Sequence, residues 1–357
     1  MIAEFSVENF FSIKSPQKIS FEPSSDTFMS DEYSCEVKDG VRLLKVGIIY
    51  GANASGKTNI LNAIEFFRML VLRMPKDRNE KTRVVPFMLD DTSRNEMTKM
   101  SMSFYINQSK FILTFELNAK YIYSETLIVY DSIRPTKLYS RSYDAETDST
   151  AIDFGGNLKL TKKSQDVISG NTINNCSVLA AFGKSNVERT RLNDVYDYFA
   201  NQVKDVLAPG MLLSGYVKSR LDKDENGDLK KFILNFLKAS DFNIEDVVLH
   251  EEEELITPEL EQLIQNAPIG NEAKAEMLRK GKITNTELTF KHKAGDGLYD
   301  LSEEYESNGT MRFMGLAVIL NFLLKTNRFV PIDEVETSIH LSLIHISRAH
   351  ETAANLV

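Results

Sequence analysis

The sequence has only two cysteines, Cys35 and Cys176, and they lie too far apart to form a CxxC pair. This usage is typical of a reducing compartment and argues against a zinc ribbon or a secreted disulfide scaffold. Long apolar runs are also lacking: the most hydrophobic stretch, residues 314–324, contains Asn321 and is too short to cross a bilayer. The first residues alternate apolar and acidic side chains and do not form a signal peptide. We therefore expect a cytoplasmic protein with no membrane partner.

Basic residues are outnumbered, 42 against 51 acidic residues, which gives a net charge of -9. A broad positively charged surface for nucleic acid is not expected, although a local basic patch is compatible with this balance. The candidates for such a patch are more often plain solvated surface; they are Lys159, Lys162, Lys163, Lys184, Arg189 and Arg191. The 357 residues and 42% hydrophobic content indicate a globular chain of about two domains, or one domain with an insertion.

The N-terminal half has the patterns of strands. Short β-prone runs occur at residues 2–7 and 18–21, and residues 43–50 are mostly apolar, as expected of a central strand covered on both faces. Residues 57–73 have helical periodicity. Alternation with a period of two then predicts an antiparallel meander, with strands at residues 101–106, 111–117, 121–130 and 137–143.

The second half is predicted to be mainly helical after an irregular polar loop at residues 144–175. Helices are expected at residues 192–206, at residues 229–237 and directly after Thr257. The acidic run at residues 251–254 is interpreted as a solvated loop face. A strand, a helix and a short strand follow, at residues 285–291, 309–324 and 328–333.

The segment Gly51-Ala-Asn-Ala-Ser-Gly56-Lys57-Thr58 satisfies the pattern G-x-x-x-x-G-K-[ST]. Small residues let backbone N–H groups turn inward around a phosphate, and the start of the following helix adds positive potential. Lys57 is then expected to pair with the β- and γ-phosphates of ATP, and the Thr58 hydroxyl to bind Mg²⁺. The alternative is a glycine-rich turn that leads into a helix.

A carboxylate pair follows the apolar run at residues 328–332. Asp333 is predicted to bind the magnesium ion together with Thr58, and Glu334 to polarise the attacking water, so that Glu334 and Lys57 are the catalytic candidates. Pro331 departs from this pattern, because proline removes a hydrogen-bond donor from a strand.

A third motif, Ser307-Asn-Gly309, stands directly before the apolar helix and upstream of Asp333. A serine and a glycine at a helix start can present a hydroxyl and free N–H groups to an anion. The alternative is an ordinary N-cap.

These three motifs, with residues 5–14 and the Pro86-Phe87 pair before the meander, resemble an ABC-type ATPase head. The likeness is to the bacterial AAA-family ATPases related to the overcoming-lysogenization-defect (OLD) family, and more distantly to RecF and SMC heads. It implies an α/β P-loop NTPase fold with an antiparallel β subdomain and a helical insertion. Four parts are implied. Residues 1–165 hold the P-loop and the meander, and residues 166–284 form the mainly helical arm. Residues 285–340 hold the signature helix and the acidic pair, and residues 341–357 are an unassigned tail.

The resemblance further implies a head-to-head homodimer that sandwiches ATP, in which Lys57 and Thr58 of one protomer face Ser307 and Gly309 of the other. It implies the nucleotide-binding set Gly51, Asn53, Ser55, Gly56, Lys57, Thr58, Asn59, Ser307 and Gly309. Ser338 and His340 match the loop after the acidic pair, which communicates across the interface. A role in bacterial phage defence or DNA processing is implied, usually with a nuclease domain or partner, and the sequence has no nuclease constellation of its own.

Two departures from the family pattern concern the magnesium-sensing glutamine and the C-terminal residues, and the second of these, together with Pro331, leaves a second function open. The glutamine that usually senses magnesium has no good match, since Gln108 lies in a predicted hairpin turn, and residues 341–357 do not match the family's continuation. We therefore expect a fragment or a divergent tail after His340. The alternative function is a nucleotide-binding switch, or an inactive fragment, that acts through a partner protein without turnover. A small-molecule kinase is disfavoured because such enzymes are more compact.

Overall fold

The computed structural model describes residues 1–25, 30–240, 242–267 and 270–335. Its contacts divide the chain into two compact units. The first comprises residues 1–207 and 327–333, and the second comprises residues 208–326 and the chain from residue 334. The boundaries predicted at residues 165, 284 and 340 concern functional parts of a head, and they stay predictions.

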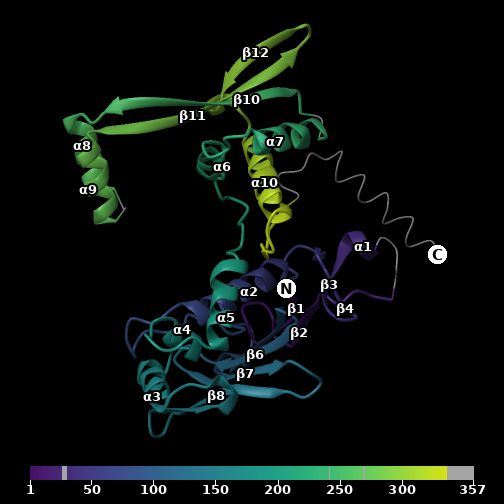
Figure 1. Cartoon of the computed structure of the whole chain (residues 1–357), viewed down its shortest axis with the longest axis vertical. Helices are drawn as coiled ribbons and strands as arrows, with labels where there is room; N and C mark the ends of the chain where they lie inside the picture. The colour runs from purple at the N-terminus through teal and green to yellow at the C-terminus, as the bar shows by residue number, and fades with distance from the viewer. Residues whose placement is uncertain (26–29, 241, 268–269, 336–357) are drawn as a thin grey trace. The chain divides into compact units, whose positions relative to one another are not determined.

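The first unit is built on a seven-stranded sheet with the order β2-β1-β5-β6-β7-β8-β9, in which all neighbours are antiparallel. The predicted meander is confirmed. The strands are β1 (Ile2–Glu8), β2 (Gln17–Ser20), β5 (Thr98–Ile106), β6 (Ser109–Leu117), β7 (Ile122–Tyr130), β8 (Thr136–Asp144) and β9 (Ser149–Phe154). Helices α2 (Lys57–Leu72), α4 (Val178–Gly183) and α5 (Arg191–Asp197) gather on one side of this sheet (Figure 1).

Strand alternation places apolar side chains on the face that these helices cover. Phe67 of α2 is fully buried at the centre of this core. Its ring centroid lies 5.8 Å from Phe5, 5.1 Å from Phe115 and 5.8 Å from Phe199. The helix that follows the P-loop is thereby fixed to the sheet by aromatic packing.

The loop predicted at residues 144–175 is wrong. This segment contains β9, the short helix η2 (Gly156–Leu158) and α3 (Lys162–Asn171). Thr161 caps α3 by accepting a hydrogen bond from the Ser164 N–H, which satisfies a free donor at the helix start. The polar composition reflects an exposed strand and a capped surface helix rather than irregular chain.

The buried central strand predicted at residues 43–50 is also wrong. Strand β4 (Val41–Leu44) ends after pairing with β3 (Ser34–Lys38), and Val46, Ile48 and Tyr50 are 61%, 66% and 70% exposed. Within the described residues, no strand pairs with residues 45–50. An apolar sequence becomes a buried strand only where neighbouring strands and helices cover it.

The helix predicted at residues 192–206 is shorter than expected. Helix α5 continues into one π-helical turn, η3 (Tyr198–Gln202), and the chain then becomes extended. Two parallel bridges, Val203 with Phe329 and Leu207 with Ile332, join this extended chain to the run predicted as a short strand. That run is therefore extended, but it pairs through isolated bridges rather than a full ladder.

The second unit combines a three-stranded sheet with helices. The order is β10-β11-β12, with β10 (Ile244–Leu255), β11 (Lys282–Ala294) and β12 (Gly297–Ser302). Helices α8 (Pro258–Asn266) and α9 (Asn271–Lys280) stand at one end of the β10–β11 ribbon (Figure 1). The acidic run at residues 251–254 is exposed as predicted, but it is part of β10 and not a loop.

The core of the second unit lies between three helices and the strands β10 and β11. The helices are α6 (Ser214–Leu221), α7 (Asp228–Lys238) and α10 (Asn308–Leu324). Phe313 of α10 stacks on Phe236 and Phe242, with ring centroids 4.8 and 5.0 Å away. The predicted helices at residues 229–237, after Thr257 and at 309–324 are confirmed. Of the helices in the described ranges, none is long and apolar enough to cross a membrane.

Candidate nucleotide-binding site

The P-loop adopts left-handed backbone at two positions, Ala54 with φ 62° and Gly56 with φ 95°. Gly56 occupies the N-cap position of α2, where no side chain caps the helix. The first N–H groups of α2 therefore receive no side-chain acceptor from the loop, and the helix dipole adds positive potential at this point. Such a helix start is suited to an anion.

The loop is closely wound around Gly51. A Cβ atom on Gly51 would lie 2.6 Å from the Ser55 hydroxyl, and the Ser55 N–H donates to the Ala52 carbonyl at 3.2 Å. The side chains of Asn53 and Ser55 are exposed. A side chain at position 51 would therefore displace the Ser55 hydroxyl from its place in the loop.

Ser12 supports the P-loop from the N-terminal strand region. Its hydroxyl accepts a hydrogen bond from Asn59 Nδ2 at 2.7 Å and would lie 3.2 Å from a Cβ on Gly56. The sequence did not single out Ser12, although it falls within the run of residues 5–14. Only the folded chain shows that this run touches the loop.

Lys57 is folded back over the loop. Its ammonium donates to the carbonyls of Gly51 at 2.7 Å and Ala52 at 2.9 Å. These carbonyls hold the positive charge of Lys57 beside the first residues of the P-loop. A phosphate bound there would offer the ammonium stronger, charged acceptors.

Thr58 meets Asp333 across 275 residues of sequence. The Thr58 hydroxyl donates to Asp333 Oδ1 at 3.2 Å. Hydroxyl and carboxylate oxygens are hard donors that suit Mg²⁺, which is usually bound by one or two carboxylates plus substrate phosphates. The described residues hold no group of three or more His, Cys, Asp or Glu that could bind a metal ion. One hydroxyl and one carboxylate oxygen fit a magnesium ion that takes its remaining ligands from a nucleotide and water.

Backbone pairing holds Asp333 in this place. The Asp333 N–H donates to the Leu207 carbonyl at 3.0 Å, and the Leu207 N–H donates to the Pro331 carbonyl at 3.0 Å. The register shifts by one residue between the bridges at Val203 and Leu207. Pro331 lies between the two bridges. Proline has no N–H to donate, so a regular ladder cannot continue through this position, which accounts for the shift.

The other predicted residues belong to the second unit. Glu334 is exposed and has a left-handed backbone with φ 49°. Ser307 is the N-cap of α10 and accepts the Thr310 N–H at 3.0 Å, so the ordinary N-cap interpretation holds for its side chain. Among the described residues, a Cβ on Gly309 would meet only the Ser307 hydroxyl, at 3.5 Å. Ser338 and His340 lie outside the described residues.

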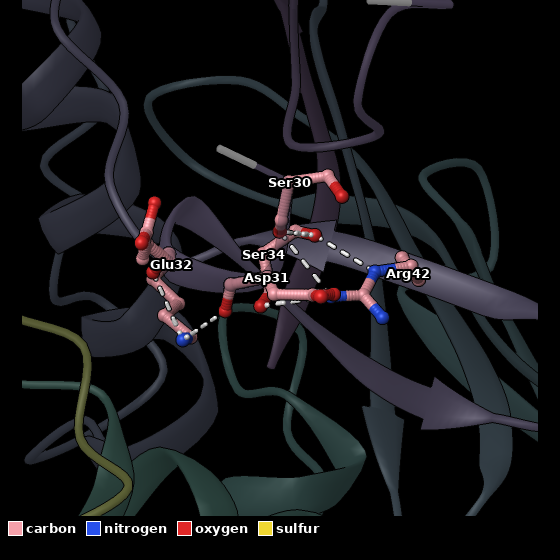
Figure 2. Close-up of polar contacts among 6 residues, drawn as sticks. Ser30, Asp31, Glu32, Ser34 and Arg42 are labelled. Atoms are coloured by element: carbon pink, nitrogen blue, oxygen red, sulfur yellow. Dashed lines mark hydrogen bonds and ion pairs between the residues drawn. The ribbon is translucent and has the colours of Figure 1, made fainter. Parts of the chain in front are cut away.

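The chain that leads toward the P-loop is anchored by Arg42. Figure 2 shows its guanidinium donating to the Ser34 hydroxyl at 2.9 Å, to the Ser30 carbonyl at 3.2 Å and to Asp31 at 2.9 Å. These bonds fasten α1 (Ser30–Tyr33) to the β3–β4 hairpin. Lys45 adds bonds to the carbonyls of Asp31 and Glu32 at 3.2 and 2.9 Å. The chain at residues 45–50, which leads to Gly51, therefore begins at a hairpin held in place by these hydrogen bonds.

Three of the basic residues considered for nucleic acid have carboxylate partners. Arg191 binds Asp131 at 2.7 Å, Lys162 lies 3.3 Å from Asp166, and Arg189 lies 3.9 Å from Asp197. The hydrogen bond from Arg191 is the main cause that lowers the pKa of Asp131. Their charge is thus partly neutralised within the chain.

Comparison with known proteins covers most of the chain. A family model described as "AAA domain, putative AbiEii toxin, Type IV TA system" matches residues 48–346, a range that includes the P-loop and Asp333. No curated protein matches the chain. A mixed α/β chain with a P-loop that touches a distant aspartate agrees with this match. The chain therefore belongs to this AAA-domain family of P-loop ATPases.

Proposed function

We propose that this protein binds ATP with Mg²⁺ and hydrolyses ATP as a nucleotide-gated head-to-head dimer, in bacterial phage defence or DNA processing. The observation that carries the proposal is the contact between Thr58 of the P-loop and Asp333. Membership in a P-loop ATPase family supports nucleotide binding. The uncapped start of α2 supports the same conclusion.

Each residue of the site has a distinct role in this proposal. Lys57 exchanges its loop carbonyls for β- and γ-phosphate oxygens, and the first N–H groups of α2 bind the same phosphates. Thr58 and Asp333 hold Mg²⁺, which neutralises negative charge on the phosphates. Glu334 orients a water molecule in line with the γ-phosphorus. The new bond forms to the water oxygen, and the bond to the bridging oxygen breaks to give ADP and phosphate.

The dimer brings a second protomer to the nucleotide. In this proposal the start of α10 offers the nucleotide the Ser307 hydroxyl, which also caps the Thr310 N–H, and the backbone N–H groups beside it, while Gly309 adds no side chain there. The resemblance to OLD-related and SMC-type heads supports this sandwich, with Ser307 and Gly309 of one protomer facing Lys57 and Thr58 of the other.

The biological setting rests on likeness alone. The OLD-related resemblance supports phage defence or DNA processing in the cytoplasm, with a nuclease domain or partner protein. The matched family is described as a putative toxin of a type IV toxin–antitoxin system. Both descriptions agree with an ATPase that acts through a partner.

A second candidate is a nucleotide-binding switch without turnover. Pro331 favours it, because proline has no N–H and the pairing of the segment that leads to the acidic pair shifts at this position.

Phosphate release from purified protein separates the two candidates. Hydrolysis predicts release by the wild type that is lost in Glu334→Gln and Lys57→Ala, while Glu334→Gln still binds ATP. The exposed Glu252→Gln variant on β10 is the matched control and should keep the wild-type rate. Nucleotide binding without release in wild type and Glu334→Gln alike would favour the switch.

A further inference from the structure

Arg68 lies on α2, three helical turns after the P-loop. Its side chain is only 17% exposed. The Nε–H group donates to two backbone carbonyls, Phe199 at 3.1 Å and Val203 at 2.7 Å. A terminal N–H donates to Asp205 at 2.5 Å. One guanidinium therefore binds three groups of a single short segment.

That segment is an unusual piece of backbone. The carbonyls that Arg68 binds lie in and directly after the π-helical turn η3. The last carbonyls of a helix lack partners within the helix, and π-turns are frequently found at functional sites. Arg68 thus satisfies carbonyls that the end of η3 leaves free.

The chain after η3 is the segment that holds the metal-side carboxylate. Phe329 N–H donates to the Gln202 carbonyl at 2.8 Å, and the Lys204 N–H donates to the Phe329 carbonyl at 2.9 Å. The pairing then runs on to the bond between Asp333 N–H and the Leu207 carbonyl. Helix α2 therefore touches this pair of segments at two places, through Arg68 and through Thr58.

From these two contacts of α2 with the paired segments we infer that Arg68 is a positioning residue for the magnesium site. Its hydrogen bonds fix where the segment at residues 199–207 lies along the axis of α2. Backbone pairing with that segment then sets the position of Asp333 opposite Thr58. The inference rests on the proposed function, since it assigns Arg68 to the same metal site.

The choice of arginine follows from the geometry. Its planar fork can bind a carbonyl pair and a carboxylate at once, whereas lysine offers a single point charge. The guanidinium is also the counter-charge to Asp205 in a cationic neighbourhood. Burial lowers the pKa of Lys204, and the nearby Arg328 and Arg68 lower it further, while Asp205 opposes them.

Magnesium titration tests the inference. Binding of a fluorescent ATP analogue is measured with increasing Mg²⁺ and, separately, in EDTA, for the wild type, Arg68→Ala and Arg68→Lys. For Arg68→Ala we expect the half-saturating Mg²⁺ concentration to rise by roughly 10–100-fold, as for removal of groups that orient metal ligands. Affinity for the analogue in EDTA should not change. The half-saturating Mg²⁺ concentration of Arg68→Lys should lie between those of the wild type and Arg68→Ala.

The matched control is Arg78→Ala, which removes a 53% exposed arginine that also binds a carboxylate, Asp148, and a backbone carbonyl. It should leave the Mg²⁺ midpoint unchanged. An unchanged midpoint in folded Arg68→Ala, or an equal loss of affinity with and without Mg²⁺, overturns the inference alone. If Arg68→Ala does not fold, the same readings on Arg68→Lys decide. A wild type without Mg²⁺-dependent binding overturns the proposed function as well.

Discussion

The Thr58 hydroxyl donates a hydrogen bond to Asp333 Oδ1 at 3.2 Å, although 275 residues separate the two in sequence. Neither local propensity nor a turn can produce this contact. It depends on the packing of α2 against the sheet and on the pairing of Asp333 with Leu207. The candidate metal site therefore exists only in the folded first unit.

Removing the hydroxyl at position 58 should weaken Mg²⁺-dependent nucleotide binding. We expect Thr58→Ala to raise the half-saturating Mg²⁺ concentration by roughly 10–100-fold, since loss of ligand-orienting partners alone has that effect. Thr58→Ser keeps the hydroxyl and should stay near the wild type. Calorimetric titration with and without Mg²⁺ measures both, and equal behaviour of alanine and serine would argue against a metal role for this hydroxyl.

Gly56 should resist substitution by alanine. Its φ of 95° is unfavourable for any residue with a Cβ, and the Ser12 hydroxyl lies 3.2 Å from the place of that atom. We expect Gly56→Ala to lose about 1–2 kcal/mol of unfolding free energy and to bind ATP more weakly. Gly170→Ala is the control: Gly170 lies in α3 with open space around it, and alanine should stabilise it by up to about 1 kcal/mol. Urea denaturation compares the two, and similar effects at both positions would contradict the argument.

The sequence predicted what depends on local pattern. The P-loop, the meander and the helix over residues 309–324 have strong signals, because small-residue spacing and apolar periodicity follow directly from backbone geometry. Asp333 was predicted from its chemistry beside the P-loop, and the contact with Thr58 agrees with that prediction.

The rest depends on neighbours that no local pattern contains. Residues 45–50 have the composition of a central strand, yet strands need partners, and the described chain offers them none. Arg68 and Ser12 are ordinary surface-type residues in the sequence. Their contacts with Val203 and Asn59 arise only from long-range packing.

A buried charge network should make the meander sensitive to Glu125. The fully buried carboxylate accepts from the Tyr139 hydroxyl at 2.6 Å, the Val178 N–H at 2.9 Å and the Ser177 hydroxyl at 3.2 Å. Glu125→Ala would leave these three donors without their acceptor and would remove the charge that interacts electrostatically with the buried Arg141, and we expect a loss of roughly 3–5 kcal/mol. Glu125→Gln should cost less.

The matched surface pair for this test is Asp153 with Lys137, where Asp153 is 70% exposed. Asp153→Asn should change the unfolding free energy by less than about 1 kcal/mol. Chemical denaturation measures all three variants, and a Glu125→Ala protein as stable as Asp153→Asn would show that the buried network contributes little.

Glu188 should contribute to acid sensitivity. Hydrogen bonds from the Ser164 hydroxyl and then from the Thr161 N–H lower the pKa of Glu188 from its ordinary value to about 2. A lowered pKa in the folded state means that the contribution is present above the ordinary value of 4.5 and is lost as the pH falls toward about 2. Denaturation midpoints of the wild type should therefore fall more steeply over this range than those of Glu188→Gln. Asp166→Asn, on the same helix α3, serves as control, and parallel profiles for wild type and Glu188→Gln would contradict the assignment.

Gly309 offers a test of the proposed sandwich. Among the described residues, a Cβ atom at this position would meet only the Ser307 hydroxyl, so we expect Gly309→Glu to fold normally but to block a second protomer. Neither Gly309→Glu nor Lys57→Ala should hydrolyse ATP alone. Mixed dimers of the two contain one intact composite site, because one subunit supplies Lys57 and the other Gly309. Part of the activity should therefore return on mixing. Gly215→Glu, at an equally open position in α6, is the control and should stay active; activity of Gly309→Glu alone, or no recovery on mixing, would exclude this arrangement of protomers.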